Sequence, residues 1–168
     1  MNAGRWARWL VTGSLLLWTG IANAEVREVI IGVDGLSCPF CVLNIEKKLK
    51  EIDALENLQI SYKHGLVKAR IKEGHRLDPA LVKRKVTDSG FTLRDLTMTV
   101  IGTIERWQQE HLAVRARGTD ELFLLDTHDP SALERYAQTK ALVAVTGKAH
   151  SHTDLPPALS VEQVSPTP

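Results

Sequence analysis

Two cysteines, Cys38 and Cys41, are the only cysteines in the chain, and they lie within residues 35–41, which read GLSCPFC. A strand-like segment precedes them and an amphipathic helix follows, so we expect the pair to lie where a loop becomes a helix. Unpaired backbone N–H groups and the positive end of the helix dipole favour thiolate over thiol there. Two adjacent thiolates bind a soft metal ion, exchange electrons, or close a small disulfide. Which of the three they do decides the function.

The other candidate ligands are histidines in expected turns and loops. His64 is expected in a hairpin turn at the same end of the sheet as the cysteine loop, where it is a candidate third ligand. His150 and His152 alternate in an expected loop, and two imidazoles there would bind Cu(II) or Zn(II) weakly. An exposed polar residue is the simpler interpretation of each. No carboxylate pair, Ser/His/Asp set or glycine-rich phosphate loop stands out, so we do not expect an enzyme.

The first residues have the features of a secretory signal peptide over 1–24. Arg5 and Arg8 give a basic start, residues 10–18 are a short apolar core, and residues 22–24 read ANA, a small-residue cleavage site. We therefore expect a periplasmic or secreted protein without stable membrane insertion after cleavage. In an oxidising compartment an unliganded cysteine pair tends to form a disulfide.

The charge of the chain is nearly balanced, with 21 Lys and Arg against 20 Asp and Glu. Such a balance lacks the basic character of a nucleic-acid-binding protein, so we expect no nucleic-acid partner. The length of 168 residues suits one domain or two small ones.

Hydrophobic periodicity and helix-capping residues predict six elements in the first part of the chain. They are a strand at 29–33, a helix starting at Pro39, strands at 58–62 and 66–71, a helix from Asp78-Pro79 to Gly90, and a strand ending near 101. The order β-α-β-β-α-β predicts a ferredoxin-like α+β domain over residues 25–101, with two helices on one face of an antiparallel sheet.

Residues 102–164 are expected to form a second, small β-rich module. The expected elements are a hairpin at 111–116 and 122–125, a helix at 130–139, and strands at 141–145 and 159–164. This pattern is compatible with a Greek-key barrel of the oligonucleotide/oligosaccharide-binding (OB) type. The last residues, 165–168, read SPTP and are expected to be a disordered tail.

Residues 28–101 resemble the heavy-metal-associated domain, a family that includes copper chaperones, the metal-binding modules of P-type ATPases and periplasmic mercury-binding proteins. Residues 35–41 match the Gly-Met-x-Cys-x-x-Cys loop of this family, and residues 87–91, which read TDSGF, match the end of its second helix. The resemblance implies that Cys38 and Cys41 are the metal ligands in a near-linear two-thiolate site. Such a site prefers Cu(I) or Hg(II), with Zn(II) as a further option.

The chain departs from the family pattern at two places. Leu36 replaces the usual methionine, a volume-conserving change in what we expect to be a buried plug. Pro39 and Phe40 stand between the cysteines, where relatives more often carry small or polar residues. Proline at this place is also found in disulfide oxidoreductases, and Phe40 would put an aromatic ring beside the metal. Lys47 and Lys48 lie further along the helix as candidate charges for docking a partner, although an ordinary solvated face is the favoured interpretation.

The sequence therefore predicts an exported protein that captures and transfers a soft metal ion through Cys38 and Cys41. The second module is a candidate for docking a membrane metal transporter or for orienting the first module. Two alternatives stay open. One is a thiol–disulfide redox protein, and the other is an interaction module in which the cysteines form a structural disulfide.

Overall fold

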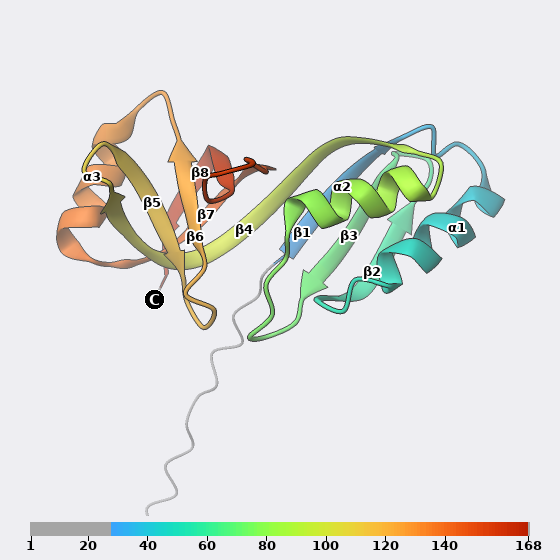
Figure 1. Cartoon of the computed structure of the whole chain (residues 1–168), viewed down its shortest axis with the longest axis horizontal. Helices are drawn as coiled ribbons and strands as arrows, with labels where there is room; N and C mark the ends of the chain where they lie inside the picture. Colours follow the sequence, from blue (N-terminus) through green and yellow to red (C-terminus); the bar gives the residue numbers. More distant parts are fainter. Residues whose placement is uncertain (1–27, 168) are drawn as a thin grey trace, which may run out of the picture.

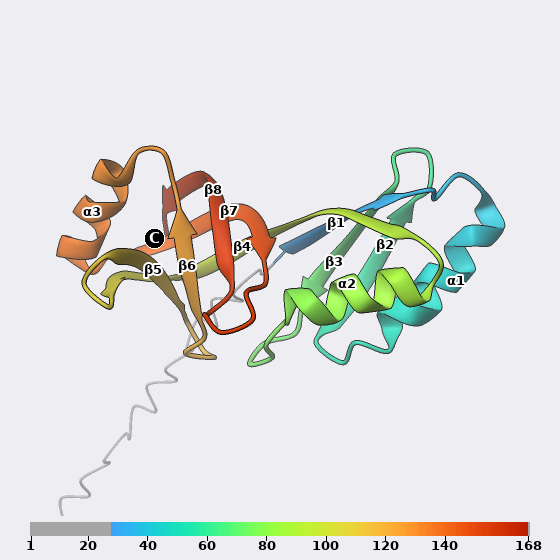
Figure 2. The same cartoon turned by 45° about the horizontal axis from the view of Figure 1, so that its top comes forward.

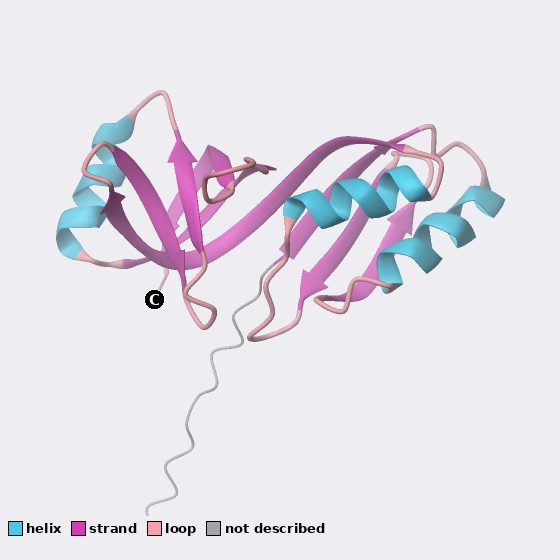
Figure 3. Cartoon of the chain, viewed as in Figure 1, coloured by secondary structure: helices cyan, strands magenta, loops and turns pink. Residues whose placement is uncertain are grey.

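The computed structural model describes residues 28–167, which form two modules side by side (Figures 1 and 3). The predicted signal peptide and Pro168 lie outside the described residues. In chain order the elements are β1 (Glu28–Asp34), α1 (Pro39–Lys50), β2 (Leu55–Ser61), β3 (Leu66–Ile71), α2 (Pro79–Asp88), β4 (Thr92–Trp107), β5 (His111–Ala116), β6 (Leu122–Asp126), α3 (Pro130–Thr139), β7 (Leu142–His150) and β8 (Ala158–Pro166).

The first module is a ferredoxin-like sheet with two helices on one face. Its strands have the order β2-β3-β1-β4, and all neighbouring strands are antiparallel. Helices α1 and α2 lie side by side on the same face of this sheet (Figure 1). As predicted, Asp78 caps α2, because its Oδ1 accepts the N–H of Ala80 at 2.8 Å and Pro79 takes the first helical position. The β-α-β-β-α-β order is confirmed.

The second module is a closed barrel of strands. The second half of β4 pairs with β5, β5 with β6, β6 in parallel with β8, β8 with β7, and β7 again with β4. The closing β4–β7 pairing runs from Thr97 opposite Lys148 to Thr103 opposite Leu142. Helix α3 lies at the end of the barrel farthest from the first module (Figure 2). This part of the chain is β-rich, as the sequence indicated.

Strand β4 belongs to both modules. It pairs with β1 from Thr92 to Met98 and with β5 from Gly102 to Trp107, without a break between them. The boundary expected between residues 101 and 102 therefore falls inside a continuous strand. Glycine weakens the interior of a strand, and so Gly102 resembles a boundary in the sequence. In the structure, its missing Cβ leaves room for the carbonyl oxygen of Arg115 within the strand.

The hydrophobic core is continuous across the two modules. Leu77 and Met98 line a small cavity together with Phe123 of the barrel. Beside it, Arg76 Nη2 donates a hydrogen bond to the carbonyl oxygen of Thr119 at 2.8 Å. The modules are thus joined by a shared strand, by shared packing and by a polar contact.

The C-terminal residues are more ordered than the sequence suggested. Ser165 and Pro166 belong to β8, and the N–H of Thr167 donates to the carbonyl oxygen of Leu142 at 3.0 Å. The expected tail at 165–168 is therefore corrected for residues 165–167, because backbone pairing with β7 holds them. Within the described range, none of the helices has the length and apolar character needed to cross a membrane.

Candidate thiol and metal site

The two cysteines lie at the start of α1, as predicted. β1 ends at Asp34, and Gly35 turns the chain with a φ of +86° that favours glycine. Cys38 is the N-cap residue of α1 with extended backbone angles, and Pro39 takes the first helical position. The N–H of Cys41 donates a hydrogen bond to Cys38 Sγ at 3.2 Å. The same N–H also donates to the carbonyl oxygen of Cys38 at 3.1 Å, so this amide at the helix end is shared between oxygen and sulfur.

Cys38 and Cys41 are joined by a disulfide in the structure, and their Cα atoms are 5.3 Å apart. The side chains of Cys38 and Cys41 therefore point toward each other, and their sulfurs meet at the start of α1. Each becomes a thiolate ligand only after the S–S bond has been reduced. The disulfide is the form expected for the redox and structural alternatives, and its reduction would give the two thiolates that the metal-binding hypothesis requires.

Apolar packing holds the loop that carries the two sulfurs against the hydrophobic core. Leu36 is only 4% exposed and belongs to the core, as expected for a buried plug. Ile45 and Leu49 are the buried residues of the amphipathic helix α1, and Cys41 packs against the same cluster. Gly35 faces the ring of Phe91, the aromatic residue after the end of α2. These contacts hold the loop between the two helix ends.

A polar contact also ties α1 to α2 near the site. Asn44 Nδ2 donates to the carbonyl oxygen of Ser89 at 2.8 Å, which satisfies one of the free carbonyls at the end of α2. Ser89 itself is buried, and its hydroxyl donates to the carbonyl oxygen of Val86 at 2.6 Å. The TDSGF segment therefore supports the cysteine loop through backbone and packing contacts.

The outer surface beside the sulfurs is apolar. Phe40 is 85% exposed and Leu43 is 66% exposed, and both lie in the first turns of α1. Phe40 flanks the cysteine pair, as its place in the sequence required. Leu43 was not anticipated. In the sequence, Leu43 lies off the helix face that carries Ile45 and Leu49, and this position could have indicated an exposed leucine.

The lysines at the other end of α1 contribute little free charge to the site. Glu51 Oε2 lies 2.6 Å from Lys85 Nζ, and Glu51 Oε1 lies 3.3 Å from Lys48 Nζ. These two lysines, Lys85 first, hold the pKa of Glu51 below its ordinary value. Lys48 is thus half of an ion pair about 10 Å along the helix from Cys41, and Lys47 is exposed.

His64 lies at the same end of the sheet as the cysteine loop, as predicted. With Lys63 and Tyr62 it lines a shallow cavity of about 480 Å³ whose opposite wall is formed by residues 33–37. Among residues 28–167, however, no three His, Cys, Asp or Glu side chains cluster in a way that could hold a metal ion. His64 is therefore not brought to the sulfurs as a third ligand in this arrangement.

His150 and His152 belong to no such group of three side chains within residues 28–167. His150 ends β7, and its Nε2 lies 2.7 Å from the hydroxyl of Ser160 on β8. His152 lies in the exposed loop that follows. The two histidines thus lie where the end of β7 runs into a loop. This placement agrees with the simpler interpretation, which is that they are exposed polar residues.

Comparison with known proteins gives matches among solved structures alone. No family model matches the chain, and no curated protein matches it. A CopZ metallochaperone is 23% identical, with a TM-score of 0.36, over 39% of this chain and 97% of its own. A putative copper-ion-binding protein from Bacillus anthracis is 24% identical, with a TM-score of 0.36, over 40% of this chain and 93% of its own. A copper-binding domain of the P-type ATPase HMA7 is 18% identical, with a TM-score of 0.36, over 40% of this chain and 90% of its own. Over about 40% of its length, the chain is thus similar to solved copper chaperones and heavy-metal-associated domains.

Proposed function

We propose that the reduced protein binds a soft metal ion, Cu(I) or Hg(II), through the thiolates of Cys38 and Cys41 and passes it to a partner. One observation carries the proposal: both sulfurs lie at one helix N-terminus, on a loop anchored by the buried Leu36. Thiolates are soft ligands, and two of them suit ions that prefer low coordination. The helix end stabilises their negative charge before the ion arrives.

Transfer follows from the openness of a two-thiolate site. A thiolate of the partner attacks the bound ion, and the sulfurs of this protein leave one after the other, so the ion is never released free. The exposed Phe40 and Leu43 offer apolar contact area beside the exchange point. A membrane metal transporter that presents its own cysteines is the kind of partner we propose.

Export adds a redox requirement to this function. If residues 1–24 direct the protein to the periplasm, the cysteine pair oxidises unless a metal ion or a reductant protects it. A dithiol reductant supplies the two electrons that open the Cys38–Cys41 bond, and its own two sulfurs become a disulfide. Metal loading then follows reduction.

Thiol–disulfide exchange itself is the second candidate function, and the disulfide between Cys38 and Cys41 favours it. In that case the protein accepts or donates an electron pair, and the metal-binding form has no role. Ready equilibration with glutathione supports this function, whereas a structural disulfide typically has a reduction potential below about −300 mV.

We also propose that the second module is a barrel of the OB type. The strand order β4-β5-β6-β8-β7, closed by β4–β7 pairing with α3 between β6 and β7, supports this assignment. Its proposed task is to fix the orientation of the first module toward the partner, because the shared strand β4 and the common core leave little freedom between them.

The test is an anaerobic titration of the reduced protein with Cu(I), Hg(II) and Zn(II), with thiols counted before and after. We expect one Cu(I) or Hg(II) per chain and loss of both free thiols on binding. The double variant Cys38→Ser, Cys41→Ser should bind neither ion, while the neighbouring control Ser37→Ala should bind both. Tight binding that survives the double substitution refutes this site. Absence of binding together with fast glutathione exchange supports the redox function instead.

A further inference from the structure

The cysteine loop, residues 34–38, has different surroundings on its two sides. Its core side is fixed by Leu36, which is buried. Its outer side faces the shallow cavity of about 480 Å³, whose walls are residues 33–37 and the β2–β3 turn, residues 62–65. Arg94 of β4 completes the lining of this cavity. Its side chain is therefore placed where it can bridge the loop and the turn.

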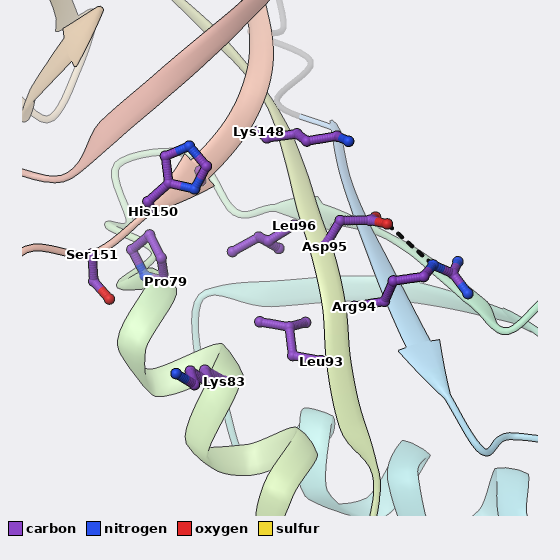
Figure 4. Close-up of a pocket in the computed structure, with 10 residues that line it drawn as sticks. Pro79, Lys83, Leu93, Arg94, Asp95, Leu96, Lys148, His150 and Ser151 are labelled. Atoms are coloured by element: carbon purple, nitrogen blue, oxygen red, sulfur yellow. Dashed lines mark hydrogen bonds and ion pairs between the residues drawn. The ribbon is translucent and has the colours of Figure 1, made fainter. Parts of the chain in front are cut away.

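The guanidinium group of Arg94 makes three polar contacts. Its Nε donates to Asp95 Oδ2 at 3.1 Å (Figure 4), and its Nη1 donates to Asp34 Oδ1 at 3.2 Å. A longer contact of 3.4 Å joins Nη2 to the carbonyl oxygen of Gly65. Asp34 ends β1 and opens the cysteine loop, and Gly65 lies in the β2–β3 turn. One planar side chain thus connects β4, the base of the loop and the turn.

Arg94 is itself held from the side of β4. Its neighbour Asp95 pairs with Gly32 of β1, and a Cβ on Gly32 would lie 2.6 Å from Asp95 Oδ1. The missing side chain of this glycine therefore leaves the space that the carboxylate occupies. The acceptor of Arg94 Nε is thus seated against the backbone of β1, where it offers the guanidinium a fixed partner.

The β2–β3 turn is a second fixed point for Arg94. The N–H of Val33 donates to the carbonyl oxygen of Gly65 at 2.8 Å. Gly65 has a φ of +59°, and a Cβ there would lie 2.5 Å from the carbonyl oxygen of Val33. Such a close approach of two backbone segments requires glycine. The turn is therefore packed directly on the end of β1, and Arg94 connects it to Asp34.

The position of Cys38 depends on the loop more than that of Cys41 does. Cys41 lies within α1 and packs against the hydrophobic core, so the helix fixes it. Cys38 lies at the end of the loop that Asp34 opens. In the oxidised protein the S–S bond itself holds Cys38 beside Cys41. After reduction, any contact that restrains the loop lowers the entropy lost when the two sulfurs are brought together again.

We propose that Arg94 is a positioning residue for the cysteine pair, which holds Asp34 and thereby keeps Cys38 beside Cys41 in the reduced protein. The same restraint favours disulfide formation and metal chelation, because both need the two sulfurs together. The metal part rests on the proposed function, whereas the disulfide part needs no metal. With glutathione as redox partner, one oxidised glutathione takes up two electrons and two protons and becomes two thiols. Cys38 and Cys41 supply both and form the S–S bond.

The first test is the equilibrium of the Cys38–Cys41 pair in glutathione buffers, measured without metal by alkylation and mass spectrometry. Arg94→Gln removes the charge and the planar fork, and Arg94→Lys keeps the charge alone. We expect both to lower the equilibrium constant for disulfide formation about two- to fivefold, the range of exposed ion pairs. The matched control Arg84→Gln, at an exposed position of α2, should leave it unchanged. A parent-like constant in Arg94→Gln overturns the proposal, and so does full rescue by Arg94→Lys, which would indicate an effect of charge alone.

The second test examines the contact between Arg94 and Asp34. The exposed Asp34→Ala should lower the same constant, and it should add little to Arg94→Gln, because both remove one contact. Full additivity of the two substitutions contradicts the proposal. A thermal melt accompanies each variant, and a lower melting temperature with an unchanged glutathione constant would show a purely structural role and overturn the proposal.

A Cu(I) competition titration of the reduced variants separates this inference from the proposed function. The affinity for Cu(I) should fall by about the same factor as the glutathione constant, because both report the cost of bringing the sulfurs together. If the parent protein does not bind Cu(I) while the glutathione constants fall as expected, the proposed function fails and the positioning role stands. If the parent binds Cu(I) and neither quantity changes in Arg94→Gln, the positioning role fails and the metal site stands.

Discussion

The backbone N–H of Cys41 donates a hydrogen bond to the Sγ of Cys38, with an N···S distance of 3.2 Å. The two cysteines are therefore not equivalent. Cys38 caps the helix and receives the positive end of a backbone dipole, whereas Cys41 packs against the hydrophobic core. This difference determines how the pair behaves once its disulfide is opened.

The reduced protein should show unequal thiol reactivity. We expect iodoacetamide to modify Cys38 several times faster than Cys41 near neutral pH, because the helix end favours the Cys38 thiolate and packing shields Cys41. Mass spectrometry of the alkylated peptides measures both rates. The single variants Cys41→Ser and Cys38→Ser give each rate in isolation, and equal rates in the two variants would show that the hydrogen bond has no effect on reactivity.

The residues on either side of the sulfurs should differ sharply in their effect on stability. Leu36→Ala should lower the free energy of unfolding by about 2–4 kcal/mol, because it empties a buried position. Phe40→Ser should change it by no more than about 0.5 kcal/mol, since that ring is exposed. Leu36→Met is the volume-matched control, with a cost below about 1.5 kcal/mol. Urea unfolding measures all three, and an equal loss for Leu36→Ala and Phe40→Ser would contradict this picture of the loop.

Acid should remove the stabilising effect of the Glu51 ion pairs. The pKa of Glu51 is lowered from 4.5, mainly by the hydrogen bond from Lys85 and then by that from Lys48. A lowered pKa in the folded state stabilises the protein above pH 4.5, and this contribution is lost as the pH falls through the lowered value. Glu51→Gln should therefore lower the urea midpoint at pH 7 and approach the parent protein on acidification. Glu110→Gln, in the exposed turn after β4, should show no such convergence, and a constant gap for Glu51→Gln from pH 7 to acid would refute the linkage.

The two modules should unfold together. Gly102 pairs with Ala116 on one side and Val143 on the other, and a Cβ there would meet the carbonyl oxygen of Arg115. We expect Gly102→Ala to lower the free energy of unfolding by about 1–3 kcal/mol. During unfolding of this variant, the circular dichroism of the helices and the fluorescence of Trp107 should change in one common transition. Gly74→Ala, which has open space around it but a φ of +72°, should cost about 1 kcal/mol. Two separate transitions in Gly102→Ala would show that the modules are energetically independent.

Local signals in the sequence were sufficient for the first module. Cys38-Pro39 and Asp78-Pro79 define helix starts by capping and by the fixed φ of proline, and the structure begins both helices there. The burial of Leu36 follows from an apolar residue in an otherwise polar loop. These features depend on a few neighbouring residues, and so a short window of sequence contains them.

Features that depend on distant residues were not predictable from local pattern. The pairing of Thr97 with Lys148 closes the barrel, but nothing near either residue indicates its partner. The oxidation state of Cys38 and Cys41 is also undetermined by their spacing, because the same geometry serves a disulfide and a two-thiolate site.

The continuity of β4 constrains how this chain can vary. From Leu96 to Ile104 its residues alternate, so that Leu96, Met98, Val100 and Ile104 are buried in the core that the two modules share. Because the side-chain period of a strand is two, one inserted residue near Thr99 would turn every later side chain to the opposite face. Two domains joined by a loop tolerate such an insertion. In this protein the length of β4 has to be kept, because a change would disrupt the packing of one module. Lineages of this protein should accordingly gain or lose residues in the turns and not in this strand.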